Sequence, residues 1–193
     1  MSKLLVIDTE TGGIDAETDS ILTLAAVVWD DGKLGASIEI KIAEDPMYVT
    51  ERAMKINRID LAVHQRIALP PRLALAQLDQ FLKENFIDET VSGGIVLAGH
   101  NINFDIRFLR RLFSICGAKF DDRFSHRSLD TASVLRFLSL ADLLPKTVLG
   151  SDEAFKWFDV MPLTSERHTA IGDARSTALM LSRLVRLIGN KSA

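Results

Sequence analysis

Apolar residues near the start of the chain fall into strand-length runs. An unbroken apolar run predicts a buried strand over Lys3–Asp8. The two glycines that follow predict a turn over Thr9–Asp15. Further apolar residues predict a second strand over Ser20–Asp30 and a third over Lys33–Ile42, joined by a hairpin turn at Asp31-Gly32.

Beyond residue 70, the pattern alternates between helix-length and strand-length segments. Pro70 and Pro71 are predicted to open a helix that runs to Phe86, because proline is tolerated in a first helical turn. The later elements are predicted as a strand at Ile95–Gly99, a helix at Ile102–Cys116, a short strand at Ser128–Asp130, a helix at Ala132–Leu140, a short helix near Glu153–Phe158 within an irregular stretch from Asp142 to Ser165, and a final helix at Thr169–Ile188. This order indicates an α/β fold with a mixed sheet. No repeat or linker-like stretch interrupts it, so we expect a single domain over residues 1–193.

Composition and charge narrow the function classes. The 193 residues, of which 47% are hydrophobic and 25% charged, are typical of one soluble domain. We expect a cytoplasmic protein, because the sequence shows neither a bilayer-spanning apolar stretch nor a signal peptide. The single cysteine, Cys116, excludes a disulfide framework and a multi-cysteine metal site. A formal charge of −3 is unusual for a nucleic-acid-binding protein, unless some of the acidic residues bind divalent cations that reverse the local field.

Two acidic residues, Asp8 and Glu10, lie at the end of the first predicted strand. A spacing of two sends both side chains to the same face of a strand, at the mouth of the sheet. Strand ends are common places for ligand sites in α/β folds. Taken alone, the pair is also explained by two solvated acids in a turn.

Asp105 lies where a charged residue is least expected. At roughly 100° per residue, Leu109, Leu112 and Cys116 fall within about 40° of it, on the apolar face of the predicted helix. The opposite face carries the basic residues Arg107, Arg110 and Arg111. Burial of an unpaired carboxylate is costly, so Asp105 needs a cation, a network of donors or a cleft. A purely structural acid, capping the helix or forming an ion pair, is the alternative.

The last candidates are His168 and Asp173, near the start of the final helix. Five residues of helix turn through roughly 500°, which would leave the two side chains about 140° apart. They converge only if His168 precedes the helix while Asp173 lies in its early turns. Asp173 is then beside the buried stripe of the helix, predicted to consist of Ile171, Ala174, Ala178, Leu181, Val185 and Ile188. A histidine that precedes a helix is usually a surface residue or a cap, so a functional role for His168 depends on which residues lie next to it.

Together, these residues resemble the signature of a known enzyme family. Asp8-Thr9-Glu10-Thr11-Gly12 is similar to a D-x-E-T motif, His100 through Asp105 to H-N-x-x-F-D, and His168 through Asp173 to H-x-x-x-x-D. Three such motifs in this order are the signature of the DEDDh branch of DnaQ-like 3′→5′ exonucleases. The spacing of five residues in the third motif favours this histidine branch over the tyrosine branch.

The resemblance covers essentially the whole chain and implies a ribonuclease H-like fold, with a central five-stranded mixed sheet flanked by helices. Leu129-Asp130-Thr131 resembles a further family feature, an Asp-Thr pair that opens a helix. Gly13-Ile14 departs from the pair that many members carry after the first motif, at a position that bears on the base pocket.

The resemblance also implies a reaction that depends on two divalent ions. Asp8 would bridge the ions, Glu10 and Asp173 would complete one site, and Asp105 would hold the other partly through water. Ligands that are all oxygen atoms suit Mg²⁺ or Mn²⁺ and argue against zinc. Two ions roughly 3.5–4 Å apart can activate the attacking water and stabilise the leaving 3′ oxygen. His168 would be the general base, and a nucleoside 5′-monophosphate would be released.

Substrate contacts follow less directly from the sequence. Phe104 is predicted to stack on a terminal base, with ordinary core packing as the alternative. The resemblance implies that Thr11 and Gly12 meet the terminal sugar. The basic helix face with Arg107, Arg110 and Arg111 either guides the phosphate backbone or is simply solvated.

The expected partner is the 3′ end of single-stranded DNA or RNA, and no short motif decides between the two. Association with a polymerase is compatible with the sequence but not indicated by it. The chain stops soon after the last predicted helix, which favours a stand-alone nuclease over a proofreading subunit.

Two other functions remain open at this point. Asp8 on a first strand and Gly172-Asp173 late in the chain also suggest a haloacid-dehalogenase-type phosphatase, but Glu10 and Thr177 stand where that family has its second acids. The other alternative is a non-catalytic nucleic-acid-binding module on the same fold, although such a module need not keep all five catalytic-type residues. Metal-dependent release of mononucleotides would separate these functions.

Overall fold

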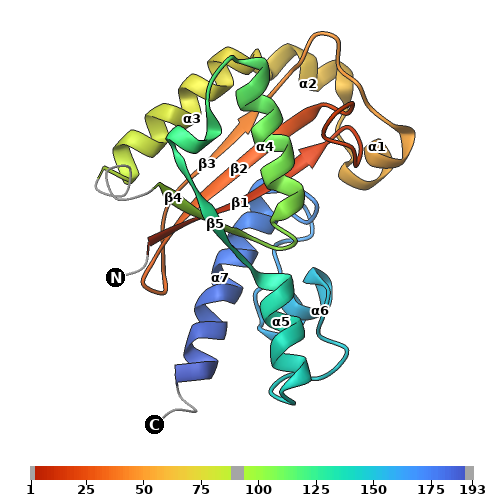
Figure 1. Ribbon diagram of the computed structural model, residues 1–193. Coiled ribbons are helices and arrows are strands. Elements are labelled where there is room, and N and C mark those ends of the chain that lie inside the picture. Colours follow the sequence, from red (N-terminus) through yellow and green to blue (C-terminus); the bar gives the residue numbers. More distant parts are fainter. Residues whose placement is uncertain (1–2, 88–93, 190–193) are drawn as a thin grey trace.

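A five-stranded mixed sheet forms the centre of the computed structural model, which describes residues 3–87 and 94–189 (Figure 1). The strands are β1 (Lys3–Thr11), β2 (Ile21–Asp30), β3 (Lys33–Lys41), β4 (Ile95–Gly99) and β5 (Phe124–Asp130). Their order in the sheet is β3-β2-β1-β4-β5. β1, β2 and β3 pair antiparallel, whereas β4 and β5 run parallel to β1. The expected sheet is therefore confirmed, and the carboxyl ends of β1, β4 and β5 meet at one edge.

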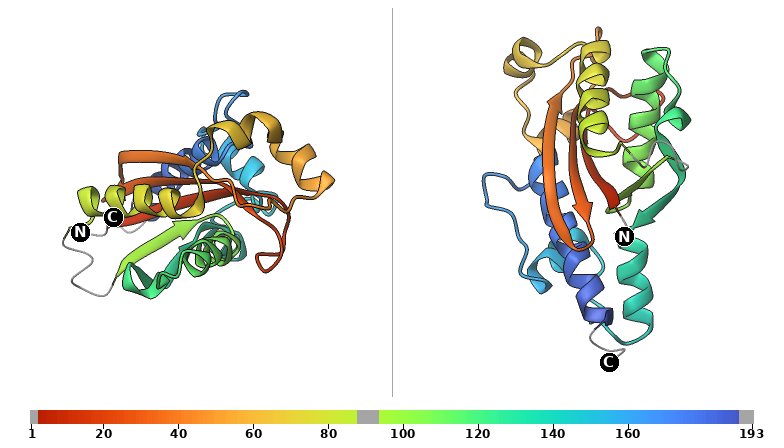
Figure 2. Two further views of the ribbon diagram at one scale, coloured as in Figure 1. Left: turned by 90° about the horizontal axis from the view of Figure 1, so that it is seen from above. Right: turned by 90° about the vertical axis from the view of Figure 1, so that its left-hand side faces the viewer.

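Helices cover both faces of the sheet (Figure 2). The long helices are α3 (Pro71–Asn85) and α4 (Asn103–Ile115) on one face and α7 (Ala170–Gly189) on the other. The shorter ones are α1 (Glu51–Asn57), α2 (Leu61–Ile67), η2 (Phe120–Asp122), α5 (Thr131–Leu140) and α6 (Ser151–Trp157). None of the helices described is long and apolar enough to cross a membrane.

The alternation of side chains along β1 decides which face of the sheet each residue meets. Leu5 and Ile7 pack into the core formed with α3 and α4, whereas Leu4 and Val6 pack into the core formed with α7. Because successive side chains of a strand point to opposite faces, the even positions after Val6 continue toward α7. The strand thus carries its next even-numbered residues, which are acidic, to the start of α7.

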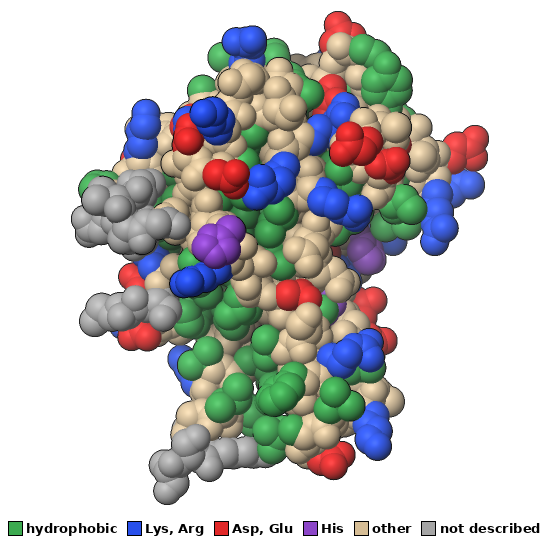
Figure 3. Space-filling model, viewed as in Figure 1, with side chains coloured by type: hydrophobic (Ala, Val, Ile, Leu, Met, Phe, Trp, Pro, Cys, Tyr) green, Lys and Arg blue, Asp and Glu red, His purple; other side chains and the backbone are tan. Residues whose placement is uncertain are grey.

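A smaller core joins α5, α6 and the second half of α7 beyond the edge of the sheet, and it includes Leu135, Phe155, Met180 and Leu184. The predicted stripe of α7 is confirmed for Ala174, Ala178 and Leu181, which are buried against the sheet. It is wrong for Val185 and Ile188, which are 50% and 45% exposed. In this half of the helix, Met180 and Leu184 form the buried face instead, because the helix has passed the sheet and packs on α5 and α6. Apolar side chains also remain on the outer surface of α5, among them Phe137 and Leu140 (Figure 3).

Two predicted boundaries differ from the structure. β1 continues through Thr11, where a turn was expected, because residues 8–11 still pair with β2. β5 begins at Phe124 rather than Ser128, since its polar middle residues lie at the edge of the sheet. The Asp-Thr pair opens α5 as expected, with Asp130 accepting hydrogen bonds from the backbone N–H groups of Ala132 and Ser133.

The helices α1 and α2 were not predicted. Each has only seven residues, which is too short for a clear helical period. The available signals were their N-caps: Thr50 accepts a hydrogen bond from Ala53 N, and Asp60 accepts from Ala62 N and Val63 N.

Candidate active site

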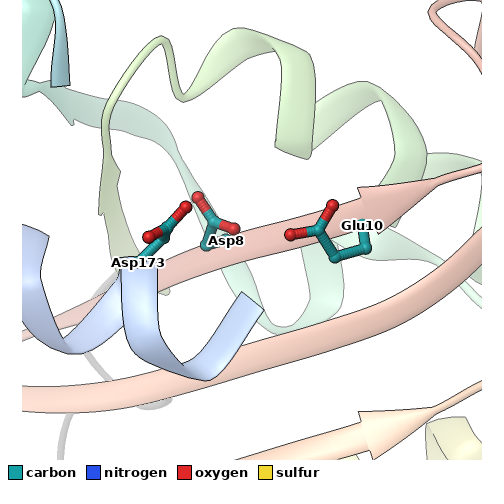
Figure 4. A group of neighbouring side chains, drawn as sticks. All are labelled: Asp8, Glu10 and Asp173. Atoms are coloured by element: carbon teal, nitrogen blue, oxygen red, sulfur yellow. The ribbon is translucent and has the colours of Figure 1, made fainter. Parts of the chain in front are cut away.

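Three carboxylates converge at the junction of β1 and α7. Asp8 and Glu10 come from the end of β1, and Asp173 comes from the first turn of α7 (Figure 4). One oxygen atom of each lies within 4.8 Å of the other two. The structure therefore brings together three of the four predicted metal ligands.

The fourth predicted ligand, Asp105, reaches the site from α4, on the other side of β1. It is 4% exposed and lies in the first turn, on the buried face of the helix beside Leu109 and Leu112. Its Oδ1 accepts a hydrogen bond of 2.7 Å from the hydroxyl of Thr9, the residue between the two acids of β1. Asp105 is thus tied to the same strand as Asp8 but lies outside the group of three carboxylates.

Burial and mutual repulsion make the ionised form of these acids costly. Burial raises the pKa of Asp8 well above its usual value, and the charges of Asp105, Glu10 and Asp173 raise it further. Burial, followed by the neighbouring carboxylates, raises the pKa of Glu10 to about 8. Burial raises the pKa of Asp105 to about 7 despite its hydrogen bonds. Groups in this state are stabilised as carboxylates by a nearby cation.

Asp173 shows where such a cation fits. Burial raises the pKa of Asp173, although the Arg167 guanidinium opposes this effect. Its Oδ2 accepts a hydrogen bond from Arg167, whereas its Oδ1 is buried and has no hydrogen-bond partner in the part of the chain that the structure describes. A buried carboxylate oxygen without a donor, next to two further carboxylates, fits a hard divalent cation.

Arg167 was missed by the reasoning from sequence. Besides Asp173, it binds Asp152 in α6, with Nη2 2.7 Å and Nε 2.9 Å from Oδ1. The only sequence signal was a basic residue next to the histidine of the third motif. Nothing in the sequence indicated that α6 would supply its partner.

His168 precedes α7, as the geometric argument required. Its backbone is left-handed, with φ of 63°. Together with Glu10, His168 lines a hollow of about 290 Å³ that extends toward β3 and α2. The imidazole does not belong to the group of three carboxylates, so it is placed beside the acids rather than among them.

A larger cavity lies on another side of Glu10. Its volume is about 490 Å³, and it is lined by Glu10 and by Thr9, Thr11, Gly13, Ile14, Asp19, Thr50, Arg52, Ala53, Ile56, Asn57 and Phe104. Phe104 is only partly buried, with its ring centroid 5.0 Å from that of Phe108. Both residues of the Gly13-Ile14 pair line this cavity.

Gly12 is held by the protein itself. Its N–H donates to Ser20 O at 2.7 Å, and its carbonyl accepts from Thr50 N at 2.6 Å. A Cβ at this position would collide with the Tyr48 carbonyl, so only glycine allows the loop to approach. Gly12 is not among the lining residues of the cavity, and its contact with a sugar stays a prediction.

Two of the three arginines on the outer face of α4 are engaged in ion pairs. Arg110 binds Asp121 at 3.0 Å, and Arg111 binds Glu44 at 2.7 Å. The hollow beside His168 contains two other cations, Lys41 and Arg58, which form no ion pair with any residue described here. Among the residues described, unpaired basic groups therefore line the hollow beside Glu10 and His168.

Comparisons with known sequences agree with the geometry of the site. The RNase_T family, described as Exonuclease, matches residues 5–181. Ribonuclease T of Pectobacterium atrosepticum is 27% identical over 187 residues, which cover 94% of this chain and 80% of that protein.

Solved structures share the fold. Exonuclease I of E. coli, in complex with a dT13 oligonucleotide, superposes with a TM-score of 0.76 and 18% identity. The match covers 98% of this chain and 43% of Exonuclease I, so this chain spans less than half of that protein. A zinc-bound form of the same enzyme with single-stranded DNA gives a TM-score of 0.77 at 18% identity.

Proposed function

The chain belongs to the RNase_T family of exonucleases, which are DnaQ-like 3′→5′ exonucleases, and from this premise we propose that it trims single-stranded DNA or RNA one nucleotide at a time. The observation that carries the proposal is the convergence of Asp8, Glu10 and Asp173, with an unpartnered carboxylate oxygen among the described residues of the site. We further propose that residues 1–193 act as one exonuclease domain. The expected cytoplasmic location stays a prediction.

Exonucleases of this family depend on divalent metal, and we propose Mg²⁺ or Mn²⁺ as the metal here. Asp8, Glu10 and Asp173 would hold the ions, together with Asp105 from the other side of β1. When bound, two such ions neutralise the carboxylates and withdraw charge from the phosphate under attack. The donor set consists of oxygen atoms, which suits these hard ions better than zinc.

His168 is the proposed general base. It accepts the proton from the water that attacks the terminal phosphodiester, and the bond from phosphorus to the 3′ oxygen of the preceding nucleotide breaks. The products are a nucleoside 5′-monophosphate and a strand shorter by one nucleotide. The position of His168 beside Glu10, outside the group of carboxylates, supports this role, because it leaves the imidazole available for a proton.

The cavity of about 490 Å³ is the proposed site of the terminal nucleotide. Its size is within the usual range for small-molecule pockets. Phe104 would stack on the terminal base, an interaction worth about 1–3 kcal/mol. Thr11 and Gly12 would lie along the sugar. On the other side of Glu10, Lys41 and Arg58 would meet phosphates of the remaining strand, a role that the sequence left open for the α4 arginines.

Of the two alternative functions raised by the sequence, one is excluded and the other is left to experiment. A haloacid-dehalogenase-type phosphatase is set aside, because the chain belongs to an exonuclease family. A non-catalytic nucleic-acid-binding module on the same fold is tested by the same assay as the proposed function.

The test is degradation of 5′-labelled single-stranded DNA, single-stranded RNA and duplex DNA with Mg²⁺ or Mn²⁺. We expect a ladder that shortens by one nucleotide at a time from the 3′ end, and no reaction in EDTA. The proposal gains further support if a bulky group on the 3′ hydroxyl protects the strand. It is wrong if a circular single strand is cut, or if no single-stranded substrate releases mononucleotides.

A further inference from the structure

Arg167 joins the two elements on either side of the histidine loop, residues 161–169 between α6 and α7. Toward α6, its Nε and Nη2 donate to Asp152 Oδ1 at 2.9 Å and 2.7 Å, and Nη2 donates to Ser151 Oγ at 3.3 Å. The guanidinium carbon also lies 5.6 Å from the centre of the Phe155 ring. Toward α7, Nη1 donates to Asp173 Oδ2. The Arg167 side chain is 14% exposed, whereas that of its partner Asp152 is 51% exposed.

The last residues of this loop are also fixed to the start of α7. The Thr169 hydroxyl donates to Glu166 O at 2.7 Å and accepts from Gly172 N at 3.2 Å. The Glu166 carbonyl lies so close to Gly172 that no Cβ would fit there. These contacts hold residues 166–172 as one compact unit, and Arg167 links this unit to α6.

The Arg167 guanidinium contacts one of the two carboxylate oxygen atoms of Asp173 and leaves the other without a donor in the described part of the chain. Oδ2 is taken by Arg167, while Oδ1 is buried and has no hydrogen-bond donor among the residues that the structure describes. A carboxylate held in this way cannot rotate freely, and one oxygen stays available for the group with Asp8 and Glu10. The Arg167 charge also lowers the pKa of Asp8, Glu10 and Asp173, although burial outweighs it at each of them.

We propose that Arg167 is a positioning residue, which clamps the histidine loop to Asp152 of α6 and presents one oxygen of Asp173 to the carboxylate group. The proposal rests on the proposed exonuclease function, because His168 and Asp173 act only if that function is correct. Arginine suits the task because its planar guanidinium donates to both carboxylates at once. A lysine ammonium is a point charge without this fork geometry.

The experiment compares Arg167→Gln, Arg167→Lys and Asp152→Asn with the wild type. Arg123→Gln is the matched control, because Arg123 is also half-buried and donates to both oxygens of Asp79, at 3.1 Å and 3.0 Å, in a different part of the fold. Four quantities are measured: kcat and KM on a 5′-labelled single strand, the affinity for Mn²⁺ by calorimetry, and the melting temperature.

We expect kcat of Arg167→Gln to fall by roughly 10–100-fold, the usual effect of losing a partner that orients a metal ligand. KM should change little, and Mn²⁺ should bind at least as tightly, because a competing cation has left Asp173. Asp152→Asn should lower kcat while leaving Mn²⁺ affinity unchanged, since it loosens the loop without touching Asp173. Arg167→Lys should remain impaired because it restores the charge without the fork. Arg123→Gln should keep wild-type kcat.

Three results would overturn the inference. The first is wild-type kcat in Asp152→Asn, and the second is wild-type kcat in Arg167→Lys. The third is a joint loss of kcat, Mn²⁺ affinity and melting temperature, which would indicate general damage to the fold. If Arg167→Gln does not fold, Asp152→Asn and Arg167→Lys still decide the question. An inactive wild type would refute the proposed function instead, so the two failures are distinguishable.

Discussion

Among the residues described, Glu44 and the carboxylates at the end of β1 are fully or partly buried, and the two places differ in how the negative charge is compensated. Glu44 is 7% exposed, and its oxygens accept from Ile21 N at 3.2 Å and from Arg111 Nη2 at 2.7 Å. At the end of β1, by contrast, Asp8 and Glu10 face a third carboxylate, Asp173. A single guanidinium, that of Arg167, forms an ion pair with this group among the residues described.

The difference separates a structural acid from a functional one. A buried carboxylate is tolerated when a cation and hydrogen-bond donors compensate for lost hydration, as they do at Glu44. The group at β1 has several acids for one guanidinium, and burial raises the pKa of Glu10 to about 8. The folded protein therefore retains an energetically unfavourable group of acids, which is expected of a site that binds further cations.

Replacing Asp8 by alanine should have the largest effect on activity. Loss of a ligand shared by the metal site should reduce turnover by on the order of 10³-fold or more, because bound metal supplies several kcal/mol of transition-state stabilisation. The metal-free variant should melt no lower than the wild type, because one repelling buried acid has been removed. Nuclease assays and thermal melting in EDTA check both parts. A well-folded Asp8→Ala variant with normal activity would contradict the metal assignment.

Replacing His168 by alanine separates proton transfer from charge compensation at the same site. Turnover should fall by roughly 10²–10⁴-fold, the usual contribution of a positioned general base. Mn²⁺ affinity should stay close to the wild-type value, because no carboxylate is lost.

The His168 comparison requires saturating metal, so that a difference in turnover does not reflect a difference in metal occupancy. An unchanged turnover in the folded variant would show that His168 is not the general base.

Glu44→Gln changes the acid whose charge is compensated, so it should affect stability rather than activity. The substitution removes the charge that Arg111 binds, so the free energy of unfolding should fall by about 1.5–3 kcal/mol, the value of hydrogen bonds to charged groups. Denaturant titration measures this loss. The folded variant should trim oligonucleotides at the wild-type rate. A loss of activity in the folded protein would show that the two acidic sites are coupled.

The stability of the metal-free protein should also depend on pH. The pKa of Glu10 is raised from 4.5 to about 8 and that of Asp105 from 3.8 to about 7. Between about pH 4 and pH 8, the folded state therefore binds more protons than the unfolded chain, and stability falls as pH rises. Each kcal/mol lost lowers the melting temperature by roughly 2–4 °C for a chain of this size.

Glu10→Gln should reduce this slope, because the substituted side chain no longer titrates. Mg²⁺ should restore stability mainly at high pH, where the carboxylates are ionised. A melting temperature of the metal-free protein that rises from pH 5 to pH 8 would contradict the account.

Much of the fold and the candidate site could be predicted because the relevant signals are local. The apolar run before Asp8 predicts a buried strand, and its period of two places Asp8 and Glu10 on one face. The helical period places Asp105 on a buried face, and the angle between His168 and Asp173 requires the histidine to precede the helix. Each inference needs only a few neighbouring residues.

What could not be predicted depends on partners that are distant in sequence. Arg111 looked like a solvated residue, yet it binds Glu44, which is 67 residues away. The partner of Arg167 on α6 lies 15 residues upstream, in a short helix without a strong period. Val185 continues the apolar pattern of α7 but lies beyond the sheet that would bury it. Tertiary packing, rather than local preference, decides these three cases.

The most direct test of the central claim is anomalous diffraction from crystals grown with Mn²⁺ and a nucleoside 5′-monophosphate. We predict two manganese peaks roughly 3.5–4 Å apart. Asp8 should touch both, Glu10 and Asp173 should touch one, and the nucleotide should occupy the cavity lined by Phe104. No manganese at these carboxylates in a crystal with the nucleotide bound would contradict the account, as would peaks confined to other acidic residues.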